Sequence, residues 1–273
     1  MRSISEDERR RGKRIGLVPT MGYLHAGHLS LMRAARERSD YLIATLFVNP
    51  MQFGPNEDFA RYPRDMQRDT ELASTAGVDV LFAPESKAMY PDGFKTIVEI
   101  PDVSSILEGK FRPTHFRGVT TVVMKLFNST KPHLAVFGQK DAQQAFLIKK
   151  MVTDLNLDLE VYVAPTVREG DGLALSSRNT YLTPDERVRA TSLYRSLTFA
   201  GQRIESGERK VETIRNGMTS ILEQAHPTQI DYIAFVRPED FSVIDVISPP
   251  SVLVLLAVRF GSTRLIDNMI FAV

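Results

Sequence analysis

Residues 19–28, with the sequence PTMGYLHAGH, hold the densest group of potentially reactive side chains in the chain. They lie between an apolar strand pattern and a helical pattern. Two histidines three residues apart at a helix start, His25 and His28, lie on one face and can point at a single ligand. The helix N-terminus and the glycines Gly22 and Gly27 favour a phosphate there, because they offer free N–H groups and no Cβ to collide with it. The pattern indicates a phosphate site, although such histidines can also simply cap the helix.

A second polar cluster, FVNPMQFGP over residues 47–55, directly follows an apolar run. Its proline and glycine residues stop that run and stiffen the turn, so Asn49 and Gln52 would lie at the carboxyl end of a strand. Their amides can donate and accept hydrogen bonds, which suits a small ligand that carries hydroxyls and a carboxylate. A turn whose polar side chains satisfy only their own backbone fits the pattern equally well.

The third cluster, FGQKDAQQ over residues 137–144, again joins a strand end to a helix start. Lys140 is a compact cation of the kind that binds phosphate. Asp141 is suited either to capping the helix, which is the common role of Asp at such a place, or to helping to hold a magnesium ion. Gln144 lies about one turn further on and offers an amide for a hydroxyl or a carboxylate.

The fourth cluster, VREGDGLALSSRN over residues 167–179, contains two glycines that would let the segment move. Ser176, Ser177 and Arg178 provide hydroxyl groups and a guanidinium for a polyphosphate. An ordinary polar linker between domains is the alternative. We favour a segment that closes over a nucleotide and excludes water.

A basic segment over residues 111–119 brings Arg112, His115 and Arg117 just ahead of a helix. These side chains could attract anions, but a solvated basic turn fits the pattern at least as well. His133 is isolated, and we expect it to be structural or exposed.

The elements that must position these clusters alternate between strand and helix. The apolar segments predict strands over residues 15–18, 41–48, 78–83, 133–138 and 157–164, and the periodicity predicts helices near residues 27–38, 64–76, 119–128 and 142–155. Such alternation indicates α/β architecture, a mostly parallel, Rossmann-like sheet wrapped by helices. Ligands of such sheets bind at the carboxyl ends of the strands, which is where the first three clusters lie.

The pattern changes after Tyr181. The remaining chain predicts helices over about residues 183–205 and 211–225, and then strands over residues 231–236, 252–258 and 263–268. We therefore expect two domains. The larger α/β domain covers residues 1–178, and a smaller α+β domain covers residues 179–273.

The composition excludes several classes of protein. The chain has 273 residues, 34 Lys and Arg against 33 Asp and Glu, and no cysteine. Balanced charge argues against nucleic acid or an anionic membrane as a partner, and the missing thiols exclude disulfides and cysteine chemistry. The motifs of P-loop, zinc-helix, nucleophile-elbow and dinucleotide-binding enzymes are absent as well.

The chain start is charged throughout and lacks the apolar stretch of a signal peptide. We expect residues 1–14 to be a frayed lead-in. The longest apolar runs are far short of the roughly 20 residues that cross a bilayer. The sequence therefore predicts a soluble, cytoplasmic protein.

The His-x-Gly-His element resembles the nucleotide-binding signature of the nucleotidyl-transferring superfamily that includes class I aminoacyl-tRNA synthetases. Together, the four clusters resemble one family within it, the pantothenate synthetases or pantoate–β-alanine ligases, from about Ile15 to about Asp267. The resemblance implies a nucleotidyltransferase domain with a C-terminal lid domain. It also implies ATP-dependent condensation of (R)-pantoate with β-alanine through a pantoyl adenylate, with release of AMP and pyrophosphate.

The resemblance also implies site residues. It assigns ATP binding to Met21, Gly22, Tyr23, Leu24, His25, Ala26, Gly27, His28, Gly138, Gln139, Lys140, Asp141, Val167, Leu175, Ser176, Ser177 and Arg178. Among them His28 would be the catalytic acid, with His25, Lys140 and Arg178 acting on the phosphates. Gln52 and Gln144 would hold pantoate, and we add Asn49 as a substrate-binding residue. The resemblance further implies Mg²⁺ bound with the nucleotide, and Asp141 is a candidate ligand for it. It also implies a homodimer.

Two departures from the family pattern leave the proposed catalytic atoms in place. Ala26 stands where an acidic residue often separates the histidine pair, and Leu175 stands where some members have methionine. Two other functions remain open. One is a nucleotidyltransferase that acts on a phosphorylated acceptor, which would need more basic residues than the amides of the second and third clusters. The other is a nucleotide-binding protein without turnover, which would lack a catalytic group.

Overall fold

The computed structural model describes residues 1–55, 57 and 59–273. The chain forms two compact units, unit 1 over residues 1–165 and unit 2 over residues 166–273. We expected the division after residue 178, but the segment from Thr166 onward groups with unit 2. Its Arg168 forms an ion pair with Asp267 of the last strand at 2.6 Å, which ties the segment to that unit. No helix in the described part of the chain is long and apolar enough to cross a membrane.

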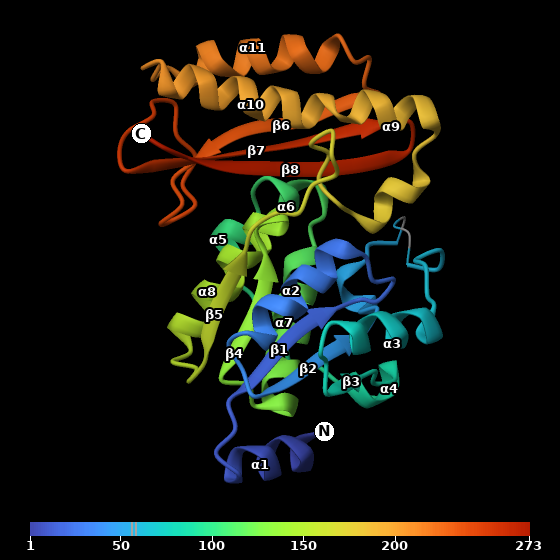
Figure 1. Ribbon diagram of the computed structural model, residues 1–273. Helices are drawn as coiled ribbons and strands as arrows, with labels where there is room; N and C mark the ends of the chain where they lie inside the picture. The colour runs from blue at the N-terminus through green and yellow to red at the C-terminus, as the bar shows by residue number, and fades with distance from the viewer. Residues whose placement is uncertain (56, 58) are drawn as a thin grey trace. The chain divides into compact units, whose positions relative to one another are not determined.

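Unit 1 is built on a parallel five-stranded sheet in the order β3-β2-β1-β4-β5, as Figure 1 shows. The strands are β1 (Ile15–Thr20), β2 (Tyr41–Leu46), β3 (Val80–Phe82), β4 (Leu134–Gly138) and β5 (Glu160–Ala164). The helices are α1 (Arg2–Arg10), α2 (Ala26–Arg36), η1 (Pro50–Gln52), α3 (Met66–Thr75), α4 (Ser86–Met89), α5 (Pro101–Ser104), α6 (Glu108–Phe111), α7 (His115–Thr130), η2 (Gln139–Asp141) and α8 (Ala142–Asp154). The predicted α/β class and all five strands are confirmed.

Helices cover both faces of this sheet because its strands are apolar on both sides. Alternate side chains of β1 enter different cores: Leu17 packs with residues of α7 and α8, and Val18 packs with residues of α2 and α3. In β4, Phe137 and Val136 divide between the same two cores. This burial fixes the register of the sheet and so the height at which each strand ends.

The chain start is a helix, and the expectation of a frayed lead-in was wrong. Helix α1 is anchored to the end of α7, where Arg9 Nη1 donates to the Lys131 carbonyl oxygen at 2.8 Å. Lys131 in turn forms an ion pair with Glu6 at 2.5 Å, and Met1 packs against the core that contains α7. These are contacts with residues more than a hundred positions away, which local composition does not reveal.

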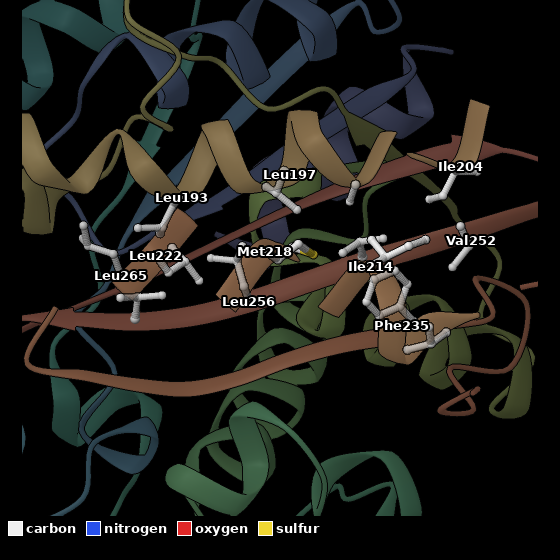
Figure 2. Close-up of a cluster of buried hydrophobic side chains, with 14 of the residues drawn as sticks. Leu193, Leu197, Ile204, Ile214, Met218, Leu222, Phe235, Val252, Leu256 and Leu265 are labelled. Atoms are coloured by element: carbon white, nitrogen blue, oxygen red, sulfur yellow. The ribbon is translucent and has the colours of Figure 1, made fainter. Parts of the chain in front are cut away.

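Unit 2 is an antiparallel three-stranded sheet in the order β6-β7-β8, with helices packed against it. Its elements are η3 (Ser177–Tyr181), α9 (Pro184–Ala190), α10 (Ser192–Glu205), α11 (Val211–Glu223), β6 (Gln229–Val236), β7 (Ser251–Phe260) and β8 (Thr263–Ala272). The single long helix expected up to residue 205 is divided at Thr191. The core between sheet and helices, shown in Figure 2, includes Leu197 of α10, Met218 of α11 and Leu256 of β7. The predicted α+β class of this part is confirmed.

Candidate active site

Three of the four sequence clusters converge at one edge of the unit 1 sheet. Residues 21–28 follow β1, residues 47–55 follow β2 and residues 139–144 follow β4, and these strands are neighbours in the order β2-β1-β4. Because the strands are parallel, their carboxyl ends meet at the same edge. Met21 Sδ lies 2.9 Å from Gln52 Nε2, so the segments after β1 and β2 are in contact.

A buried carboxylate shapes the backbone of the first segment. Asp69 of α3 is 2% exposed and accepts hydrogen bonds from the N–H groups of Tyr23 at 2.6 Å and Leu24 at 2.7 Å. Gly22 and Tyr23 have φ values of +89° and +52°, both in the left-handed region. A Cβ on Gly22 would come within 3.0 Å of Asp69 Oδ2. The carboxylate therefore stabilises a turn that needs glycine at residue 22.

His25 and His28 cap helix α2 reciprocally. His25 Nδ1 accepts from the Gly27 N–H at 3.2 Å, and His28 Nδ1 accepts from the His25 N–H at 3.3 Å. The two ring centroids lie 4.0 Å apart, and the ring planes are tilted by 38°. An Nδ1 that accepts a hydrogen bond carries no proton, so each neutral ring has its proton on Nε2. Both rings therefore keep an Nε2–H donor that the cap does not use.

The pKa values show that these rings are neutral near pH 7. Burial, assisted by the charge of Lys140, lowers the pKa of His25 to about 4. Burial, assisted by the neighbouring His25, lowers the pKa of His28 to about 3. A neutral His28 carries one ring proton, on Nε2, and that atom can donate a hydrogen bond. The effect of Lys140 on both histidines also places the third cluster beside the first.

In the second segment the two amides differ in their surroundings. Asn49 is 1% exposed, and both its amide oxygen and its amide nitrogen form hydrogen bonds with protein groups. That burial argues against the direct contact with substrate that we expected of Asn49. The alternative of a turn that satisfies only its own backbone does not fit either, because Gly118 and Tyr90 lie outside the turn. Gln52 is 7% exposed, and its Nε2 faces Met21 of the histidine segment.

The third segment presents Lys140, Asp141 and Gln144 in sequence. Asp141 makes no side-chain cap on α8, contrary to the common role of Asp at that place, and its carboxylate lies 3.4 Å from Lys140 Nζ. Gln144 is partly buried in the first turn of α8. Among the described residues, no group of three or more His, Cys, Asp or Glu side chains is arranged to hold a metal ion.

The fourth segment belongs to unit 2 and is anchored there. Arg168 pairs with Asp267 through both of its terminal nitrogens, at 2.6 Å and 2.9 Å. The N–H of Leu175 donates to the Val167 carbonyl oxygen at 3.0 Å, which closes the segment into a hairpin. Ser176 caps η3 by accepting from the Arg178 N–H at 3.3 Å. The segment is thus a structured part of unit 2 and not a loose linker.

A family model described as pantoate-beta-alanine ligase matches residues 1–270. The chain belongs to this family. Relatives in the family are similar along their whole length. The pantothenate synthetase of Acetivibrio thermocellus is 54% identical over 273 residues, which are 100% of this chain and 97% of the relative. That of Geobacter sulfurreducens is 52% identical over 270 residues, 99% of this chain and 95% of the relative.

Solved structures of pantoate-beta-alanine ligases share the fold. Pantothenate synthetase from Thermus thermophilus gives a TM-score of 0.90 at 45% identity and covers 94% of this chain and 92% of its own. The enzyme from Francisella tularensis, complexed with β-γ ATP and β-alanine, gives 0.77 at 36% identity over 98% of this chain and 94% of its own. The chain is therefore a ligase that condenses pantoate with β-alanine using ATP.

The structure adds residues to this candidate site that the sequence did not indicate. Asp69 and Tyr90 contact the site segments from 46 and 41 positions away along the chain. Arg112 is not part of a solvated turn, since its side chain is mostly buried, pairs with Glu57 and donates to the Gln52 carbonyl oxygen at 3.3 Å. His133 is structural, one of the two roles expected, because its Nδ1 accepts from the Ile15 N–H.

The depressed histidine pKa values predict a stability that falls with decreasing pH. The ordinary pKa is 6.5, whereas the folded values are about 4 for His25 and about 3 for His28. Below pH 6.5 the unfolded chain therefore binds protons that the folded chain does not, and this favours unfolding until the folded values are reached. In His28→Asn the urea-unfolding free energy should fall less than in the unsubstituted chain between about pH 7 and about pH 5. Equal losses in both proteins would contradict the assigned burial of His28.

Proposed function

We propose that the ligase works in two steps through an acyl adenylate. A pantoate carboxylate oxygen attacks the α-phosphorus of ATP, and the bond to pyrophosphate breaks. The amine of β-alanine then attacks the acyl carbon, AMP leaves with the bonding electron pair, and the nitrogen loses a proton. A carboxylate is a poor acyl donor because its oxygen is a poor leaving group, whereas AMP leaves readily. Such chemistry needs charge stabilisation and positioning, and no covalent enzyme intermediate.

The observation that supports this function best is the convergence of neutral imidazole donors and a lysine at a helix N-terminus. His25 and His28 keep Nε2–H donors, Lys140 adds positive charge, and the start of α2 adds its dipole. In this proposal they stabilise the charge that develops on the phosphates. The nucleotide in this proposal contacts two segments, Met21 to His28 and Gly138 to Asp141.

Two glutamines serve the acid in this proposal. Gln52 and Gln144 hold pantoate by its hydroxyl and carboxylate oxygens, and Gln52 also helps to place β-alanine. Asn49 supports Gln52 and does not touch the substrate. As the family resemblance implies, Val167 contacts the adenosine, and the segment Leu175 to Arg178 contacts the triphosphate.

Magnesium and a second copy of the chain complete the proposal. Magnesium prefers oxygen ligands and commonly keeps phosphate oxygens and water in its shell. The Asp141 carboxylate, which is not used as a helix cap, suits such an ion held together with the nucleotide. A homodimer is proposed from the family resemblance, and sedimentation of the purified protein tests it.

A substrate-omission assay tests the two-step function. Pyrophosphate should form from ATP and pantoate alone in an amount close to that of the enzyme, and continuous AMP production should require β-alanine. Replacing pantoate with acetate or another unrelated acid is the control. Equal pyrophosphate release with unrelated acids would refute the pantoate assignment. Transfer to a phosphorylated acceptor would instead favour the other nucleotidyltransferase function.

A further inference from the structure

Two backbone groups fix the orientation of the buried Asn49 amide. The Met51 N–H, which can only donate, lies 3.3 Å from one amide atom, and the Gly118 carbonyl oxygen, which can only accept, lies 3.0 Å from the other. The first atom must therefore be Oδ1 and the second Nδ2. A flipped amide would set a donor against a donor and an acceptor against an acceptor.

This orientation passes to Gln52. Asn49 Nδ2 donates to Gln52 at 3.2 Å, so the Gln52 atom that it meets must be Oε1. The other Gln52 atom is then Nε2, and it lies on the side of Met21 in the histidine segment. The Gln52 backbone is held separately, because its carbonyl oxygen lies 3.0 Å from His115 Nδ1 and also accepts from Arg112. The amide of Gln52 therefore presents N–H donors to the site.

Tyr90 completes the chain of hydrogen bonds. Its hydroxyl donates to Asn49 Oδ1 at 2.7 Å, the shortest bond that this amide makes in the described part of the chain. The ring packs against Phe47 and Phe94, with centroids 6.2 Å and 5.2 Å away. Burial raises the pKa of Tyr90, so the hydroxyl stays protonated at any assay pH.

We propose that Tyr90 is a positioning residue that acts through Asn49 to hold Gln52 as a hydrogen-bond donor toward the acid substrate. The proposal rests on the role of Gln52 given above. Gln52 then recognises a substrate oxygen that accepts a hydrogen bond, such as a carboxylate or a hydroxyl oxygen. A substrate group that only donates, such as an ammonium at that position, would find no acceptor.

Tyr90→Phe tests this role, because it removes one hydroxyl and keeps the ring contacts. We expect kcat/KM for pantoate to fall about five- to tenfold through a higher KM, as for the loss of one hydrogen bond, with the KM for ATP within about twofold of its original value. Tyr41→Phe is the matched control, since Tyr41 packs against the same core and lies at the amino end of β2, away from Asn49 and Gln52. An unchanged kcat/KM for pantoate in Tyr90→Phe would overturn the proposal.

A second arm separates positioning from general support of the fold. In a Gln52→Ala background, Tyr90→Phe should lower kcat/KM for pantoate by less than about twofold, because the group on which it acts is gone. An undiminished effect there would show that Tyr90 acts by another route and would also overturn the proposal. If Gln52→Ala itself leaves kcat/KM for pantoate unchanged, the role of Gln52 fails instead. The initial slope of rate against pantoate gives these values even where saturation is out of reach.

Discussion

Replacing His28 with asparagine should lower pyrophosphate release from ATP and pantoate by about 100- to 1000-fold while the chain still folds. Asparagine offers its side-chain oxygen close to the position of His28 Nδ1, so it can still accept the His25 N–H that this atom accepts now. It has no group at the position of Nε2. The substitution therefore removes the donor to the phosphates and keeps the helix cap.

His28→Gln is the matched variant, because its amide reaches the position of Nε2 but not that of Nδ1. We expect it to retain more activity than His28→Asn and to lose about 0.5–2 kcal/mol of stability with the cap. Stopped-flow release of pyrophosphate without β-alanine measures the first effect, and urea unfolding measures the second. If His28→Asn releases pyrophosphate at the original rate, His28 is only a capping residue.

Replacing Asp69 with asparagine should also have a large effect, on kcat/KM for ATP. Its two carboxylate oxygens each accept one backbone N–H, from Tyr23 and Leu24. In Asp69→Asn one of these N–H groups would face an amide NH₂, and a buried donor without a partner costs about 1–3 kcal/mol. Because the turn that they hold leads into the two histidines, we expect kcat/KM for ATP to fall about 100-fold.

Asp79→Asn is the control for this experiment. Asp79 also accepts a backbone N–H, from Leu42 at 2.7 Å, but it precedes β3 and so lies toward the amino edge of the sheet. We expect kcat/KM for ATP to change by less than about twofold in this variant. Steady-state kinetics at several ATP concentrations compares the two proteins. An Asp69→Asn enzyme with the kcat/KM of Asp79→Asn would show that the turn holds its shape without the carboxylate.

The elements of the fold could be predicted from the sequence because their signals are local. Apolar runs such as residues 41–48 give a strand covered on both faces, and the motifs stand directly after such runs. Helix α1 escaped prediction because its stability comes from Lys131 and the end of α7, which the chain places far away. The division at Thr191 lies inside a continuous helical pattern and has no breaking residue.

The site was predicted only in part for a similar reason. Residue type and order pointed to His25, His28, Gln52 and Lys140, but they gave no means of choosing between a capping and a ligand-binding histidine. In the structure the two roles are compatible, because the helix cap uses Nδ1 of each ring and leaves Nε2 for a ligand. Asp69 and Tyr90 could not be predicted as site residues. One is an aspartate in a largely polar helix and the other a tyrosine before a proline, and neither pattern indicates what the side chain contacts.

Helix α7 begins directly against the turn that carries Gln52. A methyl group on Gly118 would lie 2.3 Å from the Met51 carbonyl oxygen and 2.6 Å from the Gln52 nitrogen. Neither of these backbone atoms can move away without also displacing the side-chain amide of Gln52. Efforts to re-engineer the range of acids that the enzyme accepts should therefore leave position 118 untouched and diversify Gln144, whose helix does not share this constraint.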